Sequence, residues 1–143
     1  SCLMPCRRVL LVSLFLLWQF TLLSQETLFT VVAGENVPKD ITWREIVELY
    51  EGERDKFSNG RKAIIILPSK SHPNDYKFAK LVFDESDQFM RRHWLGLVFQ
   101  GRMSAPTYLD SDDEIMDFIK SNGNAIAILI NSKYEGRYKI EVN

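Results

Sequence analysis

Residues 125–130 read Ala-Ile-Ala-Ile-Leu-Ile, an uninterrupted aliphatic run between Asn124 and Asn131. A second run at residues 63–67, Ala-Ile-Ile-Ile-Leu, ends at Pro68. Continuous apolar runs of this length are typical of strands whose two faces are both covered, as in a parallel or mixed sheet. The two runs therefore predict two central strands.

Two further strands are expected outside this pair. Residues 28–33 (Leu-Phe-Thr-Val-Val-Ala) are apolar and rich in β-branched side chains, which favours a strand. Near the C-terminus, Tyr138, Ile140 and Val142 alternate with charged residues. This alternation is typical of an edge strand with one face in solvent.

Four amphipathic segments with apolar residues at helical spacing lie between the strands. The expected helix starts are the capping boxes Thr42–Glu45 and Ser111–Glu114, a cap at Ser71 or Asn74, and a cap at Ser86 or Asp87. The aromatic residues of these helices, Phe89 and Phe99 among them, are expected in the core. The order is strand, helix, strand, three helices and two strands, which predicts an α/β fold with a mixed sheet flanked by helices.

The N-terminal segment has the layout of a secretory signal peptide. Arg7 and Arg8 precede the apolar run at residues 9–23, and Ser24 follows it. A spanning helix needs about 20 apolar residues, so a cleaved leader at residues 1–24 is favoured over an uncleaved anchor. Its removal would take Cys2 and Cys6 with it and leave one domain at residues 25–143, in the periplasm or outside the cell.

Composition narrows the classes of function. The chain has 143 residues, 45% of them hydrophobic, with 18 basic and 19 acidic residues and a formal net charge of −1. This is the composition of a single globular domain. The absence of a basic stripe argues against nucleic acid as a partner, and it leaves an uncleaved leader as the expected route to a membrane.

Several segments in order resemble one protein family. Residues 42–52 (TWREIVELYEG) resemble a helix of phosphate-binding periplasmic proteins, and residues 57–62 (FSNGRK) resemble the turn that follows it. Residues 94–101 (WLGLVFQG), with Pro106 after them, and residues 123–128 (GNAIAI) resemble two later segments of the same family. Together they span nearly all of residues 28–142. The family is the substrate-binding protein of phosphate ABC transporters, a type II periplasmic binding protein.

The resemblance implies one lobe of the type II periplasmic binding protein fold. Complete members have two α/β lobes with the ligand between them, and this chain has the length of one. The implied function is non-enzymatic binding of phosphate or a similar oxyanion for ABC-type uptake, with a transporter permease or an envelope protein as partner. The family's Arg and Ser-Gly-Thr string would fall on Ser69 and on residues 73–75, and neither is kept. The alternative is therefore a single-lobe interaction or scaffold module that has lost its ligand.

The candidate ligand-binding residues are Ser69, Lys70, Ser71 and Asn74, in the polar loop after Pro68. Backbone N–H groups and the dipole at the start of the next helix favour an oxyanion there, and Lys70 adds charge. His72 could add charge if protonated, whereas a carboxylate at Asp75 opposes an anion. The other reading is an ordinary capped loop, which the residues alone favour because every helix start offers such donors.

Other chemistry-bearing residues have structural interpretations. Arg91 and Arg92 are expected on a solvated helix face, beside a buried stripe that includes His93 and Trp94. His72 and His93 are 21 residues apart in different elements, a spacing that does not favour a metal site. The acidic cluster, formed by Asp110, Asp112, Asp113 and Glu114, fits a helix N-terminus better than carboxylate catalysis or calcium binding. We expect neither an enzyme nor a cofactor.

Overall fold

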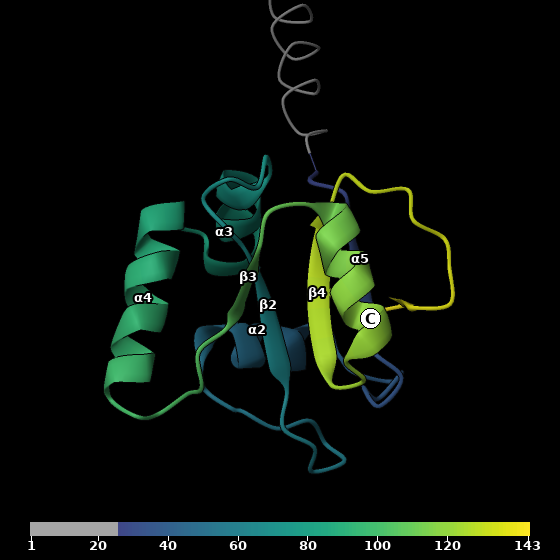
Figure 1. Ribbon diagram of the computed structural model, residues 1–143, viewed down its shortest axis with the longest axis horizontal. Coiled ribbons are helices and arrows are strands. Elements are labelled where there is room, and N and C mark those ends of the chain that lie inside the picture. Colours follow the sequence, from purple (N-terminus) through teal and green to yellow (C-terminus); the bar gives the residue numbers. More distant parts are fainter. Residues whose placement is uncertain (1–25) are drawn as a thin grey trace, which may run out of the picture.

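The computed structural model describes residues 26–143, which fold around a mixed sheet (Figure 1). Its strands are β1 Phe29–Ala33, β2 Ile64–Pro68, β3 Thr107–Leu109, β4 Ala125–Ile130 and β5 Lys139–Ile140. They lie in the order β3-β2-β4-β1-β5. β2 is parallel to β3 and β4, whereas β1 is antiparallel to β4 and β5.

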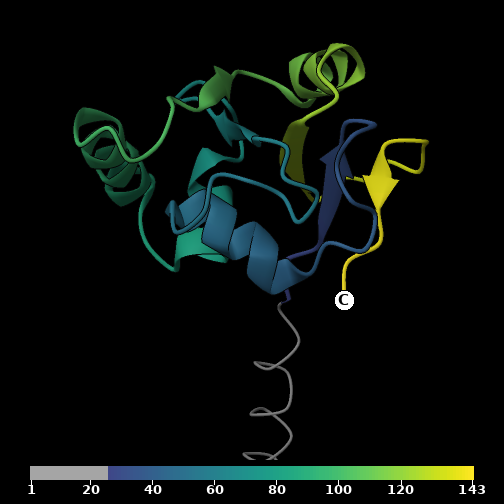
Figure 2. The same ribbon diagram turned by 90° about the horizontal axis from the view of Figure 1, so that it is seen from below.

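Helices cover both faces of this sheet, as Figure 2 shows. One face carries α2 (Trp43–Glu51), α3 (Asp75–Phe83) and α4 (Asp87–Phe99), and the other carries α5 (Asp112–Ser121). Alternate residues of β4 face the two layers: Ile126 and Ile128 pack with the three-helix layer, while Ala127 and Leu129 pack with α5. Burial on both sides explains why β4 is a continuous aliphatic run.

The structure confirms the predicted α/β class and the mixed sheet flanked by helices. The caps are also those that the sequence predicts. The side-chain oxygens of Thr42, Ser86 and Ser111 each accept a hydrogen bond from the backbone N–H three residues later, at 3.1–3.2 Å. Asn74 occupies the cap position of α3 without a side-chain capping bond.

The prediction missed β3. No sequence pattern predicts a strand at Thr107–Leu109, because three residues are too few to show an alternating pattern. They form a strand by pairing with β2 over Ile66–Pro68, a contact between segments about 40 residues apart. β3 is one of the sheet's two edge strands, and it brings Tyr108 and Asp110 next to the carboxyl end of β2.

The expectation that Phe89 and Phe99 are core residues is wrong. Phe99 is 82% exposed and Phe89 is 42% exposed. α4 covers the sheet edge with Met90, Trp94 and Leu97, all buried, so the opposite side of the helix is left in solvent. The aromatic residues of α4 therefore do not share one buried face: Trp94 lies in the core, whereas Phe89 and Phe99 are exposed.

After β2 and after β3 the chain continues on opposite faces of the sheet. β2 continues to α3 and α4 on one face, and β3 continues to α5 on the other. In open α/β sheets such a switch point, at the carboxyl ends of parallel strands, is where ligands bind.

The predicted signal peptide, residues 1–24, lies outside the described residues. Among the helices of residues 26–143, none is long and apolar enough to cross a bilayer.

Candidate functional site

The loop after β2 holds all four predicted ligand-binding residues. Ser69 donates its backbone N–H to the Leu109 carbonyl at 2.9 Å, which ties the loop to β3. Its hydroxyl donates to the Asp110 carboxylate. The Ser71 N–H donates to the Ser69 hydroxyl oxygen at 3.2 Å. The Ser69 hydroxyl thus both donates and accepts a hydrogen bond within the protein.

His72 lies in the same loop and is buried beneath it. The residue is 5% exposed, and its Nδ1 accepts the Asn74 backbone N–H at 3.0 Å. An Nδ1 that accepts carries no proton, so the Nε2 proton points to Asp112 Oδ1, 2.9 Å away. Both ring nitrogens therefore have hydrogen-bond partners inside the protein.

Carboxylates surround the first turn of α3. Asp75 is the first residue of that helix, and Asp110 and Asp112 reach the loop through Ser69 and His72. The first turn of α5 contains three acidic residues, Asp112, Asp113 and Glu114. Glu114 Oε2 also accepts the Asp110 N–H at 2.8 Å. The start of α3 therefore already has an anionic partner of its own.

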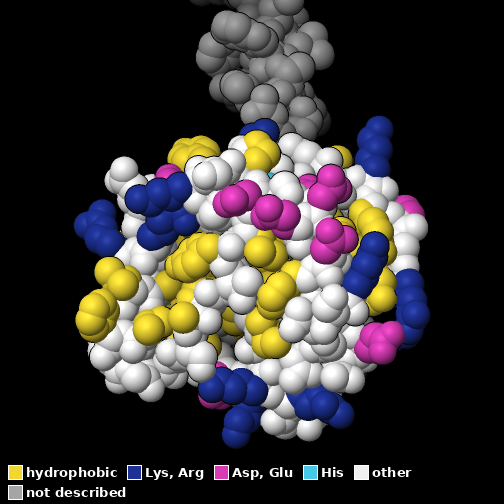
Figure 3. All heavy atoms as spheres, viewed as in Figure 1, with side chains coloured by type: hydrophobic (Ala, Val, Ile, Leu, Met, Phe, Trp, Pro, Cys, Tyr) yellow, Lys and Arg dark blue, Asp and Glu magenta, His cyan; other side chains and the backbone are white. Residues whose placement is uncertain are grey.

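A cavity of about 430 Å³ lies beside this loop, between α4 and β3 (Figure 3). Hydrophobic side chains gather on this face, with Lys and Arg side chains at the upper margin of the patch. The lining residues are Ser69, Lys70, Arg91, Trp94, Leu95, Val98, Ala105, Pro106 and Tyr108. Two of the four predicted residues, Ser69 and Lys70, thus line the cavity, whereas Ser71 and Asn74 do not.

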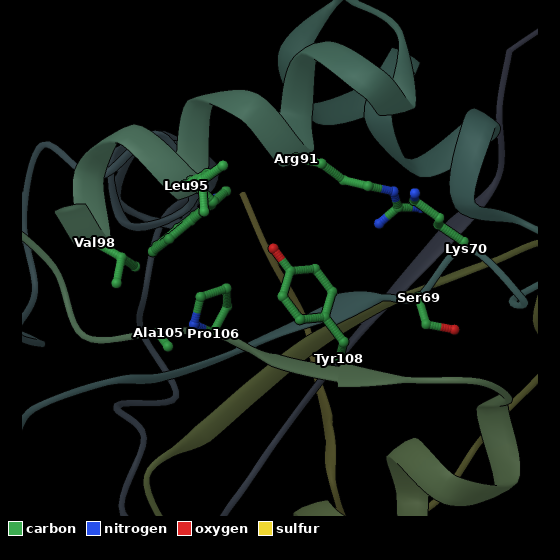
Figure 4. Close-up of a pocket in the computed structure, with 9 residues that line it drawn as sticks. Ser69, Lys70, Arg91, Leu95, Val98, Ala105, Pro106 and Tyr108 are labelled. Atoms are coloured by element: carbon green, nitrogen blue, oxygen red, sulfur yellow. The ribbon is translucent and has the colours of Figure 1, made fainter.

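The lining is polar at one end and apolar at the other. Figure 4 shows Ser69, Lys70 and Arg91 at one end, where β2 gives way to its loop. At the other end lie the apolar residues Leu95, Val98, Ala105 and Pro106, and Tyr108 stands between the two groups. The cavity therefore presents cationic groups and an apolar wall to the same occupant.

Arg91 lies in this lining, contrary to the expectation that it faces solvent. Its side chain is 16% exposed, its Nη2 lies 2.5 Å from Asp75 Oδ2, and its Nη1 donates to the Pro68 carbonyl at 3.3 Å. The contact with the Asp75 carboxylate of α3 holds the Arg91 guanidinium of α4 away from solvent. Arg92, the next residue, is exposed as predicted.

Tyr108 adds a hydroxyl to the lining. Partial burial raises the pKa of this phenol above its ordinary value, although the Arg91 charge opposes the shift. A phenol is protonated at neutral pH even at its ordinary pKa, so the Tyr108 hydroxyl can donate a hydrogen bond. Tyr108 could not be identified from the sequence, because the strand that carries it was missed.

The remaining candidates stay apart from the cavity. His93 is half-buried, and its Nε2 lies 2.7 Å from the Glu51 carbonyl oxygen at the end of α2. His72 and His93 thus have separate partners in separate elements. Within residues 26–143, no three His, Cys, Asp or Glu side chains are grouped so as to hold a metal ion.

Known proteins give no further assignment for this geometry. A scan of protein-family models finds no match to the chain, and a search of curated proteins finds none either.

Proposed function

We propose that the protein is an exported, non-enzymatic solute-binding lobe of the type II periplasmic binding protein kind, which captures an oxyanion. The carrying observation is that Lys70 and Arg91, from separate elements, line the same end of one cavity. Arginine and lysine are the usual protein partners of phosphate and carboxylate groups. Phosphate and related oxyanions are the expected ligands, and an ABC transporter permease is the expected protein partner.

The position of this cationic end supports the proposal. It lies at the carboxyl end of β2, beside the point where the chain leaves β2 and β3 on opposite faces. Ligands of open α/β sheets bind at this kind of place. Tyr108, which stands between the two ends of the cavity, adds a hydroxyl that can donate a hydrogen bond to the same occupant.

The pairing of side chains supports binding without covalent change. The Ser69 hydroxyl bonds to Asp110, and His72 bonds to Asp112. The serine and the histidine are therefore not joined as nucleophile and base.

The second candidate function is an interaction module of the cell envelope. It is favoured by exposed apolar side chains on α4, Leu95 at 58% and Phe99 at 82%, beside the edge strand β3. Exposed apolar groups that gather on one face mark interaction surfaces. Capture of envelope proteins that depends on Phe99 and is indifferent to Lys70 would favour this function over solute binding.

Calorimetric titration of the purified protein with inorganic phosphate tests the first proposal. We expect saturable heat at or below millimolar ligand. Lys70→Gln should weaken binding by about threefold or more, since it removes one partly solvated charge contact. Arg92→Gln removes the same charge from an exposed site outside the cavity and is the matched control. Absence of heat with phosphate and sulfate, or equal effects of the two variants, would refute the proposal.

A further inference from the structure

The side chains that α4 gives to the cavity lie along one stripe of the helix. Arg91, Leu95 and Val98 are spaced by four and three residues, so they share one face. With a rise of about 1.5 Å per residue, the stripe runs about 10 Å from the charged group to the last apolar one. A small inorganic oxyanion held by Arg91 and Lys70 would leave most of this length empty.

The wall opposite α4 is apolar over the same length. Ala105 and Pro106 face the Leu95–Val98 part of the helix, and the Tyr108 ring lies between them and the cationic end (Figure 4). Leu95 and Tyr108 remain 58% and 42% exposed, so an occupant would remove apolar surface from water. A volume of about 430 Å³ is within the range of pockets that bind small organic ligands.

Charge is confined to one end of this space. Among the lining residues, Lys70 and Arg91 are the charged ones, and both belong to the β2 end. Asp75 offsets part of the Arg91 charge through the 2.5 Å contact, whereas Lys70 forms no salt bridge among the described residues. One compact anionic group therefore fits this end, and an uncharged body fits the rest.

We infer that the ligand is an amphiphilic anion, in which a phosphate or carboxylate group is carried by a compact apolar body such as an aryl ring. The inference rests on the proposed function, since it assigns the anionic group to the Lys70–Arg91 end. It adds that Leu95, Val98, Ala105 and Pro106 select the body of the ligand. Inorganic phosphate is then a weak, partial ligand.

Matched ligands separate the two parts of the inference. The affinity of the purified protein is measured by calorimetry for inorganic phosphate, phenyl phosphate and benzyl alcohol. We expect phenyl phosphate to bind about tenfold more tightly than inorganic phosphate, because the ring covers apolar surface of both walls. Benzyl alcohol, which lacks the anion, should bind more weakly than phenyl phosphate.

Two surface variants of α4 give the control. Leu95→Ser removes an apolar group from the wall and should abolish most of the advantage of phenyl phosphate over inorganic phosphate. Phe99→Ser makes a similar change on the same helix outside the cavity and should preserve that advantage. Both side chains are mostly exposed, so both variants should keep the wild-type circular dichroism spectrum and melting temperature.

The outcomes distinguish this inference from the proposed function. If both phosphates bind with equal affinity and respond to Lys70→Gln, the oxyanion proposal stands and the amphiphilic ligand is refuted. If phenyl phosphate and benzyl alcohol bind equally and Lys70→Gln changes neither, the anion site is refuted. If Leu95→Ser and Phe99→Ser have the same effect on phenyl phosphate, the apolar body does not lie against α4 and the inference fails.

Discussion

His72 Nε2 and Asp112 Oδ1 lie 2.9 Å apart and join the loop after β2 to the first turn of α5. The loop leads to the three-helix face of the sheet, and α5 covers the other face. One hydrogen bond thus holds together the two chain segments that diverge at the switch point. The cationic end of the cavity lies on the same loop, since Ser69 and Lys70 precede His72 by a few residues.

Loss of this bond should destabilise the fold more than loss of an equivalent charge. In Asp112→Ala the buried His72 Nε2 proton loses its acceptor, which should lower the free energy of unfolding by about 1–2 kcal/mol. Asp113→Ala removes a carboxylate from the same helical turn at an exposed position and should cost about 0.5 kcal/mol through the helix dipole. Urea denaturation at neutral pH measures both values. Equal losses would mean that the His72 contact adds nothing to stability.

The Tyr50 hydroxyl supports the centre of the sheet. Tyr50 is fully buried, and its hydroxyl oxygen lies 3.1 Å from the carbonyl oxygens of both Ile66 and Ile126. Pairing between β2 and β4 covers Ile64–Ile65 and Ala125–Ile126, so the hydroxyl bonds where the two strands part. Tyr50→Phe should lower the free energy of unfolding by about 1–2 kcal/mol, because a buried carbonyl loses its donor. Tyr76→Phe, at an exposed site, should leave it unchanged.

Burial of the same phenol predicts a loss of stability at alkaline pH. Burial raises the pKa of Tyr50 above its ordinary value of 10.0. Above about pH 10 the unfolded chain therefore releases a proton that the folded chain keeps, and stability falls by up to about 1.4 kcal/mol per pH unit from this group. Urea denaturation at about pH 9 and pH 11 should show a smaller decrease in Tyr50→Phe than in the wild type. Parallel decreases would contradict this assignment.

Gly52 is required at the end of α2 for two separable reasons. Its φ is +78°, and a Cβ there would lie 2.4 Å from Leu97 Cδ1 of α4. Gly60 has a similar φ of +83° but open space around it. Gly60→Ala should cost about 1 kcal/mol from backbone strain alone, and Gly52→Ala should cost about 1–2 kcal/mol more because Leu97 must move. Thermal unfolding of the two variants gives the difference, and equal melting temperatures would rule out the contact.

Local patterns in the sequence predict most of this fold. β4 and β2 are visible because each is a continuous aliphatic run, and Thr42, Ser86 and Ser111 are visible as caps because a cap depends on residues three positions apart. β3 is not visible, because its three residues become a strand by pairing with β2 across about 40 residues. Elements that depend on their own residues were predicted, and the one that depends on a distant partner was missed.

The candidate site divides in the same way. Lys70 could be proposed from the sequence because it lies in a polar loop that precedes a helix. Arg91 could not be placed, since its position results from a contact with Asp75 on another helix. Helical spacing favours a solvated arginine unless an acidic partner on a neighbouring element is known. Tyr108 lies on β3, and Ala105 and Pro106 directly precede this strand, so this side of the cavity could not be predicted without β3.

The contact between Arg91 and Asp75 predicts that one substitution should change stability and affinity in opposite directions. Their side chains are 16% and 17% exposed, so in Asp75→Asn the guanidinium loses a partly buried carboxylate, and the free energy of unfolding should fall by about 1–2 kcal/mol.

The same change removes a negative charge from the cationic end of the cavity. The affinity for inorganic phosphate should therefore rise by about threefold or more. Calorimetric titration at low ionic strength measures the second effect. Asp87→Asn, in the first turn of α4 and outside the cavity lining, is the matched control and should not raise the affinity. If Asp75→Asn leaves phosphate affinity unchanged or weakens it, Arg91 does not contribute charge to the ligand, and Lys70 alone would have to account for binding.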